Sequence, residues 1–302
     1  EVTNAIAYDE GANFKAGNYN ITKNEGKLSI TALSADDDLT ITPNNAEYTY
    51  NAESHSAGSA SASASVAGTN VSLEYRVEGS PDTEWRSDAS VITAINAGTV
   101  TIEVRASAAN YTGYKYAEQT LTIKKRDVEL TSASASKVYD GAPLIKDWVD
   151  MGPNRDDTGF IWTDLVGDGR VHATGSQTVV GTSDNTISYQ LKEGAANNYN
   201  ILPENFGTLT VTAQSIVPDP KNPESYTGAT ISNPSDSVYN GEDHKWTPEV
   251  KDAEGKALVE GTDYTVSYDT PNFTDAKTIK VTISGIGNYT GTAIKTYKIT
   301  PA

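Results

Sequence analysis

Apolar and polar residues alternate along many short stretches of this chain. The clearest alternation covers residues 71–77, 100–105, 119–123, 264–268 and 279–283. Because successive side chains of a strand point to opposite faces, this pattern predicts strands with one buried face. No long segment carries apolar residues at helical spacing. The pattern therefore predicts an all-β chain with little helix.

Two short phrases recur along the chain. The first is a tyrosine followed by Asp or Asn and then glycine, which suits a tight turn because glycine accepts a positive φ. Its copies begin at Tyr50, Tyr139 and Tyr239, and the third position is Ala52, Gly141 and Gly241, respectively. We expect the three tyrosines to occupy equivalent positions in successive domains.

The second phrase, Asn-Tyr-Thr-Gly, begins at Asn110 and recurs letter for letter at Asn288. Together the phrases predict four segments, residues 1–32, 33–125, 126–214 and 215–302. The first segment matches the end of the third, so we interpret it as the C-terminal half of a truncated unit. Half a β domain leaves strand edges unpaired. We expect it to be poorly packed, or stabilised by the next domain or a neighbouring molecule.

Short strands in units of similar length favour small immunoglobulin-like β-sandwiches, arranged in tandem as an extended rod. A β-grasp module is the alternative, because residues 142–157 leave room for a short helix. Residues 56–66 alternate Ser and Ala, which fits either a flat strand with small side chains or a flexible linker. Their strict period of two favours the strand.

Composition narrows the classes of function. The formal charge of −17 repels phosphate and anionic lipid, so we expect no nucleic-acid partner and no binding to membrane surfaces. The chain has no cysteine, which excludes thiol catalysis and thiolate metal sites and fits a secreted bacterial protein. No apolar run approaches a membrane span, so we expect no membrane insertion.

The third segment contains Lys137-Val138-Tyr139-Asp140-Gly141, then Thr174-Gly175-Ser176-Gln177-Thr178, then Asn198-Tyr199. In these phrases it resembles the YDG repeats of large bacterial surface adhesins, as does segment 1–32. The second and fourth segments resemble the MBG repeats of the same proteins. The resemblance implies an extracellular, cell-wall-anchored surface protein that forms a monomeric rod. It carries no catalytic residues and no cofactor.

Exposed tryptophans are the candidate ligand contacts, because a flat indole ring can stack on a sugar. Trp148 and Trp162 lie in the least regular stretch of the chain and are the first candidates, with Trp85 as the third. Packing in a core or between domains is the competing interpretation. That interpretation is preferred for Trp246, which lies within the recurring phrase.

Other chemistry finds little support. Glu53 with His55, and Glu242 with His244, could each offer two metal ligands, but two are too few for a site. Equivalent repeat positions indicate equivalent packing, so we expect no metal. No strand–turn–helix elbow presents a nucleophile, and no pair of carboxylates stands out for glycoside hydrolysis. We therefore expect a protein that is not an enzyme.

The sequence thus predicts a repeat region of a bacterial surface adhesin that acts as a stalk, as a multivalent adhesion module, or as both. Mucin, other host glycans or matrix proteins are the expected partners. The alternative is a set of carbohydrate-binding or spacer modules carried by a larger secreted glycan-active enzyme.

Overall fold

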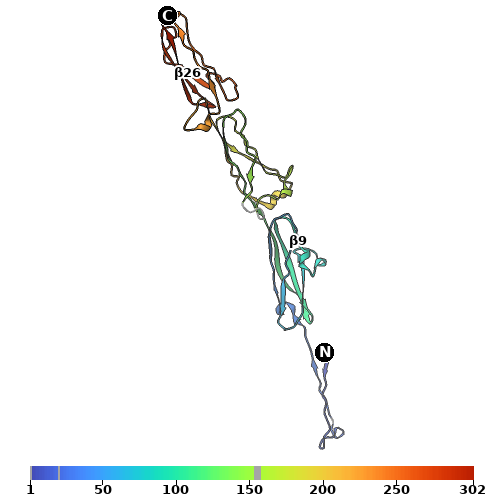
Figure 1. The fold of residues 1–302 in the computed structure, drawn as a ribbon. Helices are drawn as coiled ribbons and strands as arrows, with labels where there is room; N and C mark the ends of the chain where they lie inside the picture. The colour runs from blue at the N-terminus through green and yellow to red at the C-terminus, as the bar shows by residue number, and fades with distance from the viewer. Residues whose placement is uncertain (1, 20, 153–157) are drawn as a thin grey trace. The chain divides into compact units, whose positions relative to one another are not determined.

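The computed structural model describes residues 2–19, 21–152 and 158–302, and it is almost entirely β (Figure 1). In the described residues the only α-helix is α1 (Ala35–Asp38), and the other helical segments are 3-10 turns. The chain forms two compact units, residues 1–125 and 126–302. The prediction of an all-β chain is confirmed.

Residues 33–125 form a β-sandwich. Its larger sheet has the order β5-β12-β10-β8, and β12 runs antiparallel to β10 and parallel to β5. The strands of the larger sheet are β5 (Ala46–Thr49), β8 (Val71–Val77), β10 (Gly98–Ala108) and β12 (Lys115–Lys124). The remaining elements are β3 (Leu33–Ser34), β4 (Leu39–Thr42), β6 (His55–Ser56), β7 (Ser61–Ala64), η2 (Asp82–Glu84), η3 (Ala89–Val91), β9 (Thr93–Ala94) and β11 (Tyr111–Thr112).

The core of this sandwich follows from the alternation in the sequence. Ile102, Val104 and Ala106 of β10 are fully buried, while the residues between them face outward. Leu39 of β4 packs against Ala106 from the opposite layer. The strand β7 lies within the Ser-Ala stretch and pairs antiparallel with β4, so the strand interpretation holds for residues 61–64.

The third domain, residues 126–214, has the same arrangement of strands as residues 33–125, but its strands are shorter. In its main sheet β21 lies between β15 and β18. Its elements are β13 (Arg126–Val128), β14 (Thr131–Ser132), β15 (Ala135–Val138), β16 (Val149–Asp150), η4 (Trp162–Asp164), β17 (His172–Ala173), β18 (Gly181–Asn185), β19 (Ile187–Ser188), η5 (Ala195–Asn198), β20 (Tyr199–Ile201) and β21 (Gly207–Thr212).

The fourth domain has a four-stranded sheet in the order β24-β29-β27-β26. Its core contains Ile279, Val281 and Ile283 of β27, all fully buried. The elements are β22 (Gln214–Ser215), η6 (Pro223–Ser225), β23 (Thr230–Ile231), β24 (Ser237–Val238), β25 (Val250–Lys251), β26 (Tyr264–Tyr268), β27 (Lys277–Gly285), β28 (Tyr289–Thr290) and β29 (Thr292–Thr300).

Three pairings recur in all three domains. The first strand pairs in parallel with the strand of the Asn-Tyr phrase, as β3 with β11, β13 with β20, and β22 with β28. The strand before the Tyr-Asx turn pairs in parallel with the last long strand, as β5 with β12, β15 with β21, and β24 with β29. An antiparallel pair faces that sheet, as β4 with β7, β14 with β16, and β23 with β25.

This connectivity is that of an immunoglobulin-like β-sandwich, in which an early strand joins the edge beside the last strand. The β-grasp alternative needed a helix within residues 142–157. Residues 142–152 contain no helix, and residues 153–157 lie outside the described part of the chain. The sandwich prediction is confirmed.

The segment 1–32 contains one short hairpin, β1 (Val2–Asn4) with β2 (Gly26–Leu28), and the turn η1 (Ala16–Asn18). Its pairing of Asn4 with Gly26 matches the pairing of Asn185 with Gly207 in the third domain. Yet no side chain described between residues 3 and 32 is buried. The segment is poorly packed, as expected, because it has no second layer of strands to cover its apolar residues.

Candidate functional site

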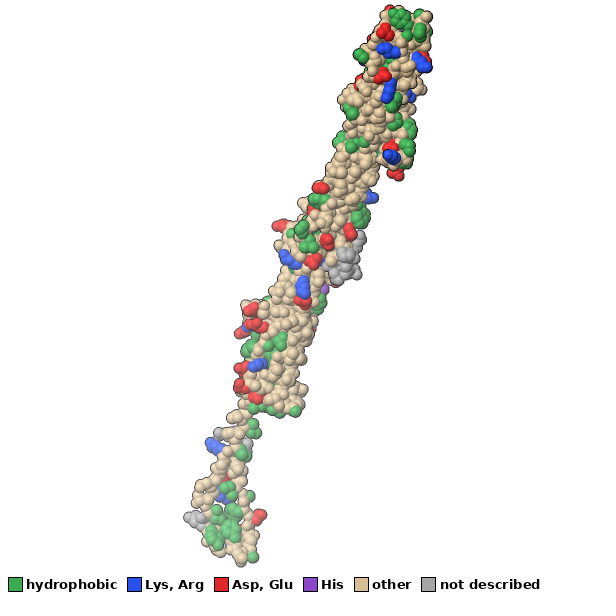
Figure 2. Space-filling view, turned by 90° about the vertical axis from the view of Figure 1, so that its left-hand side faces the viewer, with side chains coloured by type: hydrophobic (Ala, Val, Ile, Leu, Met, Phe, Trp, Pro, Cys, Tyr) green, Lys and Arg blue, Asp and Glu red, His purple; other side chains and the backbone are tan. Residues whose placement is uncertain are grey.

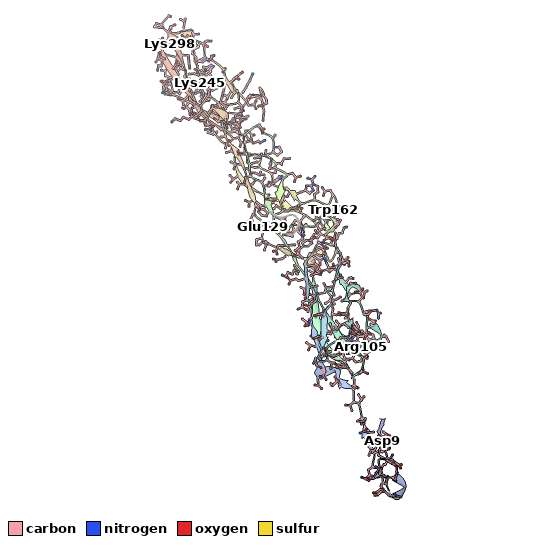
Figure 3. All side chains as sticks on the ribbon, turned by 60° about the horizontal axis from the view of Figure 1, so that its bottom comes forward. Asp9, Arg105, Glu129, Trp162, Lys245 and Lys298 are labelled. Atoms are coloured by element: carbon pink, nitrogen blue, oxygen red, sulfur yellow. The ribbon has the colours of Figure 1, made fainter. Side chains whose placement is uncertain are left out.

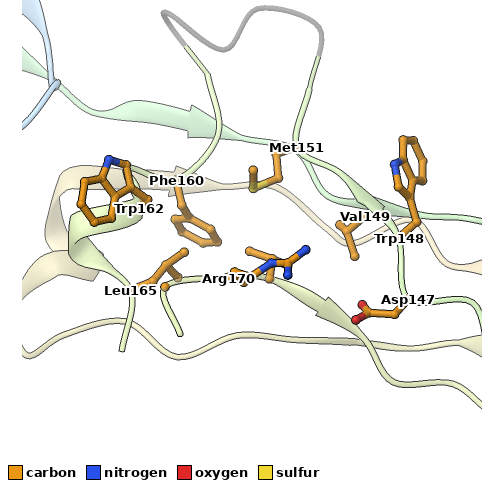
Figure 4. Close-up of a pocket in the computed structure, with 10 residues that line it drawn as sticks. Asp147, Trp148, Val149, Met151, Phe160, Trp162, Leu165 and Arg170 are labelled. Atoms are coloured by element: carbon orange, nitrogen blue, oxygen red, sulfur yellow. The ribbon is translucent and has the colours of Figure 1, made fainter. Parts of the chain in front are cut away.

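The two leading tryptophans line one pocket of the third domain, with a volume of about 310 Å³ (Figure 4). Trp148 directly precedes β16, and Trp162 begins η4. The close-up shows the two indoles at opposite ends of the pocket, with Phe160, Leu165 and Arg170 between them. The sequence pattern did not show that the chain would bring these two residues to one site.

The pocket has an apolar floor and exposed aromatic ends. Phe160 and Leu165 are buried, at 7% and 6% exposure. Trp148 and Trp162 are 54% and 74% exposed, so most of each indole faces solvent. Figure 3 shows Trp162 at the margin of the third domain. Removing apolar surface from water is favourable, and the two exposed indoles are not covered by the folded domain. A ligand that covers them would therefore gain this free energy.

Phe160 anchors the floor of the pocket. Its ring packs edge-on against Tyr199, with ring centroids 5.1 Å apart, and lies 4.8 Å from Tyr189. The Tyr199 hydroxyl donates to Asp164 Oδ2 at 2.7 Å and accepts from the Ile161 N–H at 3.0 Å. The tyrosine of the Asn-Tyr phrase therefore holds η4, and with it the backbone that carries Trp162.

Charged residues define the polar side of the pocket. His172 bonds Asp147 through Nδ1 at 3.1 Å and Asp168 through Nε2 at 2.7 Å. These bonds raise the pKa of His172, with Asp147 as the larger cause and Asp168 as the second. The bond to His172 is also the main reason that the pKa values of Asp147 and Asp168 are lowered. Both carboxylates are therefore held in the ionised form.

The pKa shift of Asp147 is opposite to the shift that a general acid needs. A glycosidase needs one carboxylic acid that keeps its proton near neutral pH, which requires a raised pKa. Asp147 lines the pocket and its pKa is shifted the opposite way. Ionised Asp147 and the guanidinium of Arg170 can accept from and donate to ligand hydroxyls while the indoles contact an apolar ring face.

Trp85, the third candidate, is engaged within its own domain. Arg76 and Arg105 lie over its ring, at 4.6 and 4.3 Å from the ring centre. Both arginines pair with glutamates across the sheet, Arg76 with Glu103 and Arg105 with Glu74. Guanidinium–indole stacking of this kind covers the outer face of the sheet. Trp85 is thus engaged by side chains of its own domain, and Trp148 and Trp162 remain the candidate ligand contacts.

The Tyr-Asx-Gly phrases form the same turn three times. The backbone N–H of each tyrosine donates to the last residue of the final strand, as Tyr50 to Lys124, Tyr139 to Thr212, and Tyr239 to Thr300. The next side chain accepts from the N–H two residues further on, in Asn51, Asp140 and Asn240. The three tyrosines thus hold equivalent places in their sheets. The third turn residue takes φ values of +64°, +78° and +80° at Ala52, Gly141 and Gly241.

A histidine near each of two of these turns forms a hydrogen bond with a side chain of the turn. His55 Nε2 bonds Asn51 Oδ1 at 2.8 Å, and His244 Nε2 bonds Asn240 Oδ1 at the same distance. No group of three or more potential metal-binding side chains occurs in the described residues. Trp246 packs against the core of the fourth domain, in the role expected of it.

No pattern in the sequence indicated Asp147, Arg170 or the two hydrogen bonds of His172. Asp147 and Arg170 lie on separate segments of the chain, and only the fold brings them to one pocket. Acidic side chains elsewhere are spread over the domains on the face seen in Figure 2. No helix among the described residues is long and apolar enough to cross a membrane.

No family model and no curated protein sequence matches the chain. Among solved structures, it is similar to the titin I-band fragment I67–I69, at 10% identity and a TM-score of 0.29 over 88% of this chain and 99% of that one. It is similar to surface layer protein SbsC, domains 4–9, at 14% identity and 0.26, over 89% and 48%. It is also similar to SGBP-B of Bacteroides ovatus, in complex with a mixed-linkage heptasaccharide, at 10% identity and 0.21, over 88% and 71%. At these scores the likenesses do not indicate a function.

Proposed function

We propose that this chain is a repeat region of a bacterial cell-surface adhesin of the MBG and YDG kind, and that its third domain binds a glycan. The observation that carries the proposal is the pocket between Trp148 and Trp162. It combines two exposed indoles with an apolar floor and a charged rim. The second and fourth domains act as spacers that present this site outside the cell.

The chemistry of a sugar matches this pocket. A pyranose ring has one apolar face of C–H groups, which suits an indole, and an edge of hydroxyls that both donate and accept. Asp147 and Arg170 supply complementary groups at the rim. Single sites of this kind bind weakly, and repetition along a chain and across a cell surface raises the effective affinity through multivalency.

A glycan array with the full chain tests the proposal, with mucin O-glycans and plant or bacterial polysaccharides as the probes. We expect Trp162→Ala to weaken binding of the recognised glycan at least about tenfold, or ~1.4 kcal/mol. Because Trp162 is largely exposed, its loss should leave the thermal unfolding unchanged.

Tyr116→Ala is the matched control, since it removes a 57% exposed aromatic ring from the second domain. Its glycan binding should equal that of the unaltered chain. If no glycan binds, or if the two variants bind equally, the glycan-binding role is wrong and a spacer role alone is left. Binding confined to plant or bacterial polysaccharides would instead favour the alternative, in which the domains are carbohydrate-binding modules carried by a larger secreted glycan-active enzyme.

A further inference from the structure

The third and fourth domains meet through two specific contacts. The ring of Tyr139 packs edge-to-face against Tyr289, with centroids 5.6 Å apart and planes at 80°. The Val180 N–H donates to Asn288 Oδ1 at 2.9 Å. Tyr289 is only 6% exposed, and its burial raises the pKa of its hydroxyl to about 12. We name these two contacts together the tyrosine joint.

Both sides of the joint come from the recurring phrases. One side is the Tyr-Asx-Gly turn of the third domain, together with the residue just before β18. The other side is the Asn-Tyr turn of the fourth domain, where Asn288 and Tyr289 lead into β28. Gly291 of that phrase is needed there, because a Cβ would lie 2.5 Å from Ser215 Oγ and its φ is +88°.

The fourth domain carries the first side of the joint again at its own end. Tyr239 is held to Thr300 as Tyr139 is held to Thr212, at 2.9 and 2.8 Å. Ala276 precedes β27 as Val180 precedes β18, because Lys277 pairs with Ile299 and Gly181 with Val211. In both cases the paired residue is the one before the end of the final strand.

These groups are exposed in the fourth domain. Tyr239 is 43% exposed and Val238 is 58% exposed, whereas Tyr139 is partly buried against the core of the next domain. Ala276 is exposed, and its N–H makes no hydrogen bond to the described residues. An apolar ring beside a free amide donor is the same pair of features that engages Tyr289 and Asn288.

We propose that Val238, Tyr239 and the Ala276 N–H form a docking surface for a further domain of the same type, joined after Thr300. The docking domain presents an Asn-Tyr turn, whose tyrosine packs on Tyr239 and whose asparagine oxygen accepts from Ala276. The contact between the third and fourth domains would thus recur at the far end of the fourth domain, with the same groups in the same places.

The test extends the chain by its own repeat, so that residues 1–300 are followed by a second copy of residues 213–302. Amide hydrogen exchange by NMR then reports on Ala276. We expect its exchange to slow at least about tenfold relative to the original chain, because the N–H gains a hydrogen bond. Asn288→Ala in the added copy alone should restore the fast exchange.

The Val180 amide is the internal reference, since it already makes this bond. Unchanged exchange at Ala276 with a protected Val180 would overturn the proposal. Slow exchange at the Ile279 and Ile283 amides of the added copy shows that the copy is folded.

A second measurement uses the original chain and does not depend on the added copy. Tyr139→Ala, Asn288→Ala and the double variant form a mutant cycle on the free energy of unfolding. A non-additive cycle is expected if the turn and the asparagine act as one joint. A strictly additive cycle would mean that the two contacts between the third and fourth domains do not act together as one joint. The proposal of an equivalent docking surface at Tyr239 would then be wrong.

Discussion

At the scale of single residues, one position departs from the repeat and still keeps its geometry. Ala52 stands where the other two turns have glycine, yet it takes φ +64°. The left-handed region costs an alanine about 1–2 kcal/mol, because its Cβ crowds the following carbonyl. The hydrogen bonds of Asn51 with Glu53 and His55 hold the turn against that cost.

Exchanging these residues between turns gives opposite effects. Ala52→Gly should raise the free energy of unfolding of its domain by about 0.5–1 kcal/mol, because strain is relieved while glycine adds entropy to the unfolded chain. Gly141→Ala should lower the free energy of unfolding by about 1 kcal/mol. Backbone strain is the only cause of this loss, because a Cβ at this position meets no atom within 4 Å. Chemical denaturation measures both, and a loss of stability in Ala52→Gly would contradict the argument.

His172 makes the stability of the third domain depend on pH. Its pKa is raised in the folded protein by Asp147 and then Asp168. A raised pKa means that the contribution is fully present below the ordinary histidine pKa, near ~6.5, and is lost as pH rises through the folded value. The lowered pKa values of the two aspartates add stability that is lost only as pH falls into the acid range.

The melting temperature should therefore fall as pH rises from ~6 to ~8, and His172→Gln should remove most of that slope. Thermal unfolding monitored at a series of pH values measures it. His244→Gln is the control, because His244 bonds the neutral amide oxygen of Asn240. A slope that survives in His172→Gln but is lost in His244→Gln would overturn the assignment.

At the scale of elements, the third domain depends on a buried polar residue at the end of β18. Asn185 is fully buried, and its side chain donates to Ala133 and Lys146 and accepts from the Gly175 N–H. Its carbonyl accepts from Ser132. One residue thus ties together the segments around Ala133, Lys146 and Gly175. Short strands with little apolar area need such links.

Asn185→Ala should lower the free energy of unfolding by about 3 kcal/mol, because two partly buried carbonyls and one buried N–H lose their partners. Urea denaturation followed by tryptophan fluorescence measures this, since Trp148 and Trp162 lie in the same domain. Asn200→Ala is the matched control, since it loses one exposed hydrogen bond to Asp127 and should change little. Equal effects of the two variants would show that Asn185 is not a structural link.

The segment 1–32 leaves its apolar side chains exposed although its hairpin has the same register as one in the third domain. Leu28 and Ile30 correspond to Leu209 and Val211 of the third domain, which are buried at 0% and 1% exposure. In the first segment they are 56% and 101% exposed. In the third domain β21 lies in a sheet between β15 and β18, whereas among the described residues β2 of the first segment pairs with β1 only. An identical hairpin register therefore does not by itself produce a core.

At the scale of the whole molecule, three domains share one connectivity although their sequences differ at most polar positions. The shared features are few. Each domain has a parallel pair at the Asn-Tyr phrase, a parallel pair before the Tyr-Asx turn, and buried alternate residues on the long strands. The three domains differ outside this frame, and the pocket of Trp148 and Trp162 lies in a stretch where the third domain differs from the other two.

The sequence by itself determined the strands, the repeated turns and the equivalence of Tyr50, Tyr139 and Tyr239. These features depend on local chemistry, namely period-two alternation and residues that accept a positive φ. Only the tertiary structure decided that Trp148 and Trp162 share a pocket, that arginines cover Trp85, and that His172 bridges two aspartates. Such groupings depend on how separate elements and loops fold against one another, and no local pattern in one sequence encodes which side chains of different loops will meet.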